Sequence, residues 1–101
     1  MFLFAAALYA CGDSLHVDGT VEDSNGSPWS STIQVDIFAA DDVGVDGAEA
    51  YDTANTADFE FDVPAGDWVV MGAAGTCSGQ SDVSGEDGES VTTTVSMICV
   101  E

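Results

Sequence analysis

The chain has 101 residues, 46% of them hydrophobic, and carries nineteen Asp and Glu, one His and no Lys or Arg, so its formal net charge is −19. Affinity for nucleic acid depends on Lys and Arg that neutralise phosphates, so this composition argues against a nucleic-acid partner. Electrostatic attraction to anionic lipid headgroups is excluded for the same reason. The length suits one compact domain, and the apolar content predicts that the chain folds around a single core.

The chain opens with an apolar run that ends in Leu8-Tyr9-Ala10-Cys11. These four residues resemble the lipobox of bacterial lipoproteins, in which a long apolar residue stands three positions before the cysteine and a small residue directly precedes it. The resemblance implies cleavage before Cys11 and lipidation of Cys11. Residues 1–10 would then be the signal segment and residues 11–14 the tether of the lipid anchor.

No positive n-region precedes this run, so we expect the signal segment to be truncated at its start. A buried N-terminal strand or a short membrane helix are the alternatives, although residues 2–10 are shorter than the ~20 residues of a membrane-spanning helix. Gly12, rather than Asp, follows Cys11, and by resemblance to known sorting rules this argues against retention at the inner membrane. We therefore expect a protein anchored by its lipid in the bacterial outer membrane, on the periplasmic or the surface face.

Two cysteines remain once Cys11 is lipidated, namely Cys77 and Cys99. Export permits disulfides, and a bridge that closes a loop of about twenty residues stabilises a fold by on the order of 3 kcal/mol. Two buried free thiols are the alternative. A structural zinc site usually collects four Cys or His ligands, and only His16 could join these two cysteines. The sequence thus predicts a Cys77–Cys99 disulfide and no metal or other cofactor.

Period-two alternation of apolar and polar residues recurs after the tether, whereas helical periodicity does not. Seven strands are predicted, over residues 15–22, 33–38, 49–53, 58–63, 67–74, 80–84 and 90–100. In the last of them Val95, Met97 and Cys99 share one face, so Cys99 is expected to point inward. Short strands separated by turns are typical of a β-sandwich.

Two ordered motifs resemble the carboxypeptidase regulatory-like domains. The segment 19–28 (GTVEDSNGSP) is similar to the opening G-x-V-x-D-x-x-G-x-P of that family, and the segment 57–68 is similar to its G-x-F, strand, v-P-a-G-x-Y stretch, with Ala57 in place of Gly and Trp68 in place of Tyr. The resemblance implies a transthyretin-like, seven-stranded Greek-key sandwich over residues 15–101. It also implies a non-catalytic accessory domain, because the catalytic zinc domain of carboxypeptidases has no counterpart in the chain.

No catalytic residues are expected. A Ser or Cys nucleophile needs a base, and the only candidate, His16, is predicted on the outward face of the first strand with no nucleophile near it in sequence. We interpret His16 as a solvated side chain.

Two binding alternatives remain open. Asp41, Asp42, Asp46 and Glu49 cluster in one loop and could hold calcium in an adhesin-like domain, but Gly44 and Thr53 occupy positions where an EF-hand-like loop needs ligands, so we favour a solvated loop. Trp29, beside a turn, could serve a carbohydrate-binding module together with loop carboxylates. The sequence therefore predicts a non-catalytic, lipid-anchored envelope protein that binds an envelope protein or a glycan or acts structurally.

Overall fold

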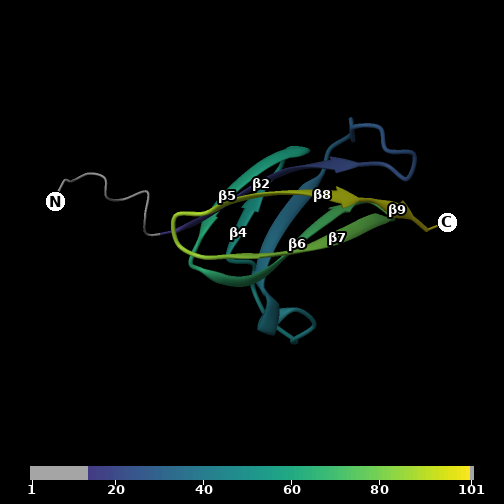
Figure 1. Cartoon of the computed structure of the whole chain (residues 1–101). Helices are drawn as coiled ribbons and strands as arrows, with labels where there is room; N and C mark the ends of the chain where they lie inside the picture. The colour runs from purple at the N-terminus through teal and green to yellow at the C-terminus, as the bar shows by residue number, and fades with distance from the viewer. Residues whose placement is uncertain (1–13, 101) are drawn as a thin grey trace, which may run out of the picture.

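The computed structural model describes residues 14–100, and in this part of the chain it is built from β-strands in two sheets (Figure 1). The strands are β2 (Leu15–Glu22), β3 (Gln34–Ala39), β4 (Asp52–Ala54), β5 (Asp58–Val63), β6 (Gly66–Ala74), β7 (Cys77–Gly85), β8 (Ser90–Ser96) and β9 (Ile98–Cys99), and a single 3-10 turn, η2 (Ala40–Asp42), follows β3. The predicted all-β class is confirmed. Among the described residues there is no helix long and apolar enough to cross a membrane.

One sheet has three strands in the order β5-β2-β8, and the other has five in the order β4-β3-β6-β7-β9. β2 and β8 run parallel, whereas every other pair of neighbouring strands is antiparallel. β2 runs from the end of the sandwich where the described chain begins, which we call the tether end, to the opposite end, which we call the far end (Figure 1).

The core lies between the two sheets and follows the predicted alternation. In β5, for example, Phe59, Phe61 and Val63 are buried while the acids between them are exposed. Both sheets contribute to one cluster of buried side chains: Leu15, Val17, Val21, Ile33, Val35, Ile37, Phe59, Phe61, Val63, Trp68, Val70, Val95 and Met97. No polar or charged residue is buried in the described part of the chain.

Two turns behave as the sequence motifs indicate. Gly26 has a φ of 85°, a conformation that suits glycine, and Asp23 accepts backbone hydrogen bonds at its side-chain Oδ1 from Asn25 and Ser27. At the tether end Gly66 follows Pro64 with a φ of 142°, and the chain then delivers Trp68 to the core. The indole Nε1–H of Trp68 donates a 2.8 Å hydrogen bond to the Pro64 carbonyl, which satisfies its one polar atom.

β7 extends beyond the predicted strand at both ends, and three of its inward positions carry small residues. Gly79, Ser81 and Gly85 face inward but do not add to the alternation of apolar and polar residues from which strands are predicted. The sequence therefore predicts a strand only over residues 80–84. These small side chains let β7 approach β8 of the other sheet, and the Ser81 and Thr93 hydroxyls are hydrogen-bonded across the gap.

The predicted last strand is two strands that belong to different sheets. β8 pairs with β2, and after Met97 the chain crosses to the five-stranded sheet, where β9 pairs with β7. Met97 is buried at the crossing. The third predicted strand also shifts, to β4 at residues 52–54, because the segment before it forms the acidic loop.

Substituting Gly79 with Ala should destabilise the sandwich strongly. A Cβ at this position would overlap the Ser96 backbone carbonyl, which cannot move as a side-chain end can. We expect a loss of about 3 kcal/mol or more in the free energy of unfolding, at the upper end of overpacking effects. Chemical denaturation of both proteins measures it.

Gly44→Ala is the control for that substitution. Gly44 has a φ of 84° and open space around the missing Cβ, so this variant should lose only about 1 kcal/mol through its backbone conformation. Equal losses in the two variants would show that β7 and β8 do not approach as closely as described.

Candidate functional site

The outer face of the three-stranded sheet gathers acidic side chains around the only histidine. We call it the acidic face. Its outward residues on β2 and β5 are His16, Asp18, Thr20, Glu22, Asp58, Glu60 and Asp62. In the β2–β5 register, His16 lies opposite Asp62 and Asp18 lies opposite Glu60. β8 adds hydroxyls beside them, and Thr92 donates a 2.7 Å hydrogen bond to Asp18.

His16 contacts three carboxylates. Its Nδ1 lies 2.9 Å from Asp62 Oδ1, and its Nε2 lies 3.3 Å from Glu60 Oε1 and 3.6 Å from Asp18 Oδ2. The hydrogen bond to Asp62 and the negative charge of all three neighbours raise the pKa of His16, against a smaller opposing effect of burial. His16 faces outward as predicted, but it is an ion-paired residue rather than a freely solvated one, with 32% of its side chain exposed.

A hydroxyl does lie beside this histidine in space, because Ser90 pairs with His16 in the β2–β8 register. The row Asp62, His16, Ser90 has the residue types of a hydrolytic triad. However, Nε2 lies against Glu60 and Asp18, which favour the protonated ring. Among the described residues no hydrogen bond joins His16 to Ser90, so the row lacks the contact between nucleophile and base that a triad requires.

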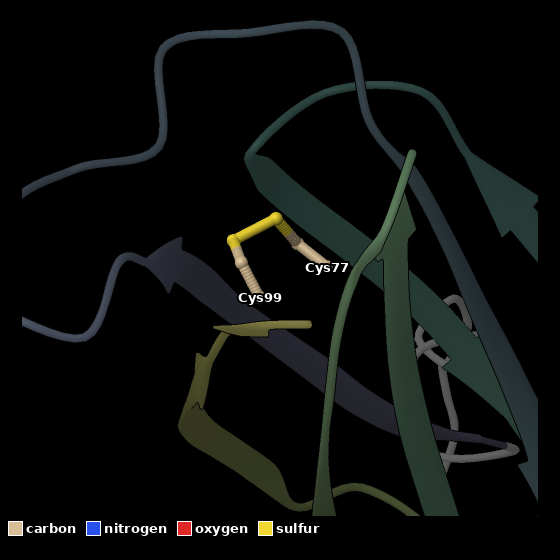
Figure 2. Close-up of a disulfide and its surroundings, with 2 residues drawn as sticks. All are labelled: Cys77 and Cys99. Atoms are coloured by element: carbon tan, nitrogen blue, oxygen red, sulfur yellow. A yellow bond between two sulfur atoms is a disulfide. The ribbon is translucent and has the colours of Figure 1, made fainter. Parts of the chain in front are cut away.

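The disulfide predicted from the cysteine count is present. Cys77 begins β7 and Cys99 ends β9, and the two residues are directly paired in the antiparallel register (Figure 2). The bridge joins the terminal strand to its neighbour at the far end of the sandwich (Figure 1). The third cysteine, Cys11, lies outside the described residues.

The predicted inward orientation of Cys99 is wrong. Cys99 is exposed and Cys77 is half-buried. Alternation places Val95 and Met97 in the core, but the crossing after Met97 carries Cys99 to the edge of the other sheet, beyond the buried cluster.

The acidic loop between β3 and β4 leaves its carboxylates in solvent. Asp41, Asp42, Asp46 and Glu49 are all exposed. Over residues 14–100 no group of three or more His, Cys, Asp or Glu side chains is arranged to hold a metal ion.

Trp29 lines a hollow at the far end. The segment Pro28-Trp29 folds back beside the end of β2, where the backbone N–H of Trp29 donates a 2.9 Å hydrogen bond to the Val21 carbonyl. The hollow has a volume of about 340 Å³ and is lined by Thr20, Val21, Glu22, Pro28, Trp29, Ala57 and Asp58; we call it the Trp29 hollow. Trp29 is half-buried and packs against the core, so it is less open than the sequence suggested.

Sequence reasoning missed Glu22 and Asp58 as neighbours of Trp29, and the acidic neighbours of His16. Glu60, Asp62 and Asp58 reach these sites only through the pairing of β2 with β5, which brings together segments that lie about forty residues apart. Once these two strands are paired in register, their outward positions give the acidic face directly.

No known family model matches the chain, and no curated protein matches its sequence.

Removing the disulfide should destabilise the protein. We expect the double variant Cys77→Ser/Cys99→Ser to lose about 2–4 kcal/mol in the free energy of unfolding, because a bridge over a sequence separation of 22 residues restricts the unfolded chain. Intact mass before and after reduction establishes the bridge in the exported protein. Two alkylatable thiols in the unreduced, unfolded protein would contradict it.

His16 should make stability depend on pH. Its pKa is raised in the folded protein, so its contribution is complete below the unfolded-state pKa of ~6.5 and is lost as the pH rises through the folded-state value. We expect His16→Gln to cost up to about 1 kcal/mol near pH 6 and less near pH 9. The difference in the free energy of unfolding between the two proteins is measured at both pH values. Repulsion among the other acids is the same in both proteins and cancels in this difference. A constant difference would contradict the prediction.

Proposed function

We propose that the chain is a non-catalytic, lipid-anchored module of the bacterial cell envelope, attached at the outer membrane on its periplasmic or surface face. The observation that carries this proposal is the odd cysteine. Cys77 and Cys99 pair with each other, which leaves Cys11, at the end of the lipobox-like Leu8–Cys11 sequence, free for lipidation. The first strand of the described part of the chain, β2, begins only four residues later, at Leu15.

This placement gives the domain a defined orientation. The tether would leave the sandwich at the tether end, and the sandwich would stand close to the membrane, since four extended residues span at most about 14 Å. Several acids lie at that end, in the strand ends and the turn nearest to it: Asp62, Asp67, Glu86, Asp87 and Glu89. They would repel anionic headgroups, so the acyl chains alone would hold the protein at the membrane.

We further propose that the domain is a diverged carboxypeptidase regulatory-like sandwich of the seven-stranded, Greek-key, transthyretin-like type, in which β8 and β9 correspond to the single last strand of that type. The positive φ of Gly26 and the burial of Trp68 after Pro64 support this, because both motif segments have a local structural reason. The engagement of both His16 ring nitrogens with carboxylates supports the non-catalytic part of the proposal.

A carbohydrate-binding module is the second candidate, because the Trp29 hollow combines an aromatic ring with two carboxylates that could accept hydrogen bonds from hydroxyls. A glycan array probed with the Cys11→Ser protein and with its Trp29→Leu derivative tests it. Binding that requires Trp29 would favour this candidate.

Cys11→Ser should release the protein from membranes into the soluble envelope fraction. The acyl anchor is the proposed membrane attachment, and a chain of −19 charge gains nothing from anionic lipid. Fractionation after a high-salt wash, with Cys77→Ser/Cys99→Ser as the matched cysteine control, measures the change. A Cys11→Ser protein that stays in the membrane pellet would refute lipid anchoring.

A further inference from the structure

We propose that the Trp29 hollow binds an alkylammonium group, such as a lysine side chain of a partner protein or a small quaternary amine. The proposal goes beyond envelope anchoring and rests on the proposed function only for the orientation of the hollow.

The hollow joins an aromatic ring to two carboxylates that have no partner. Glu22 and Asp58 line it, and neither side chain has a hydrogen bond or an ion pair to any described residue. His16, the one side chain in this part of the chain that could neutralise an acid, is engaged with Asp18, Glu60 and Asp62. An incoming cation would supply the missing opposite charge.

The part of the Trp29 side chain that is exposed in the hollow consists of ring carbons and does not include the indole N–H. The Nε1 atom is buried and has no hydrogen-bond partner, whereas the residue as a whole is partly exposed, so the side chain presents carbon to the hollow. The face of an indole ring attracts a cation through the ring quadrupole. A sugar hydroxyl, in contrast, could not reach the N–H without movement of the ring, and a neutral ligand would leave both carboxylates uncompensated.

The dimensions fit one such group. About 340 Å³ corresponds to roughly ten water molecules at ~30 Å³ each, enough for an ammonium head and a short methylene chain. Pro28 and Ala57 give apolar surface for the methylenes, and Thr20 gives a hydroxyl. The lining thus separates an apolar part from a charged part, as a lysine side chain does.

The position of the hollow makes it available to a partner. It lies at the end of β2, about 20 Å along the strand from Leu15, where the tether would leave. On a lipid-anchored protein the hollow would face away from the membrane.

Titration of the whole chain carrying Cys11→Ser with butylammonium chloride, against sodium chloride at equal ionic strength, tests the proposal. Nitrogen-proton NMR spectra resolve the two indole groups, and Trp29→Leu assigns them by deleting one. We expect butylammonium to shift the Trp29 signal in a saturable way and to leave that of Trp68, which is bonded to Pro64 in the core, unchanged. Choline chloride and a blocked lysine amide, run in parallel, distinguish a quaternary amine from a lysine side chain.

Matched variants distinguish binding in the Trp29 hollow from non-specific attraction of a cation to the acidic chain. In these variants the affinity for butylammonium is measured from the backbone amide signals of Thr20 and Asp58. Trp29→Leu should weaken butylammonium about 3- to 30-fold, the range of a cation–π interaction. Glu22→Gln should weaken it a few-fold, whereas Glu49→Gln, which removes the same charge from the acidic loop, should not. Equal effects of the two glutamine variants, or a response to neutral oligosaccharides but not to butylammonium, would overturn the proposal. Neither result would bear on membrane anchoring, which fractionation decides independently.

Discussion

Every acid in this chain has to reach solvent, because the chain has no Lys or Arg to neutralise one inside the protein. An unpaired buried carboxylate would cost several kcal/mol, and in residues 14–100 none is buried. This constraint explains the strict alternation in β5 and the purely apolar core. It also means that backbone hydrogen bonds, apolar burial and one disulfide hold the sheets together, and that side-chain ion pairs contribute only at His16.

His16 occupies the place where the repulsion between strands would be greatest. Asp18 and Glu60 are directly opposite each other on β2 and β5, an arrangement in which like charges destabilise a sheet. The imidazole lies within 4 Å of both and also contacts Asp62, so a single proton reduces the repulsion among three carboxylates. Elsewhere the acids are spread over turns and strand ends, where salt screens them over ~8 Å at physiological ionic strength.

The sequence predicted those parts of the fold in which local chemistry and tertiary structure agree. Phe59, Phe61 and Val63 alternate with acids, and Trp68 follows a Pro-Ala-Gly turn, so the buried face of each of these two strands can be predicted from its own sequence. The full length of β7 could not be predicted in this way. Close approach of the two sheets requires Gly79 and Ser81 at inward positions, where apolar residues would have indicated a buried face. The approach of Glu60 and Asp62 to His16 depends on the register of β2 with β5, which strand periodicity within each segment does not encode.

The position of the disulfide is explained by the absence of buried apolar side chains in residues 98–100, after Met97. Beyond this residue Ile98, Cys99 and Val100 are exposed, and β9 forms only two residue pairs with β7. So short an edge strand buries no apolar side chain and would separate readily from its neighbour, because local opening is easiest where few buried contacts resist it. Cys99 is therefore useful at an exposed position: the covalent bond replaces the packing that the terminal strand does not have, and it keeps the Met97 crossing, with its buried side chain, in place between the two sheets.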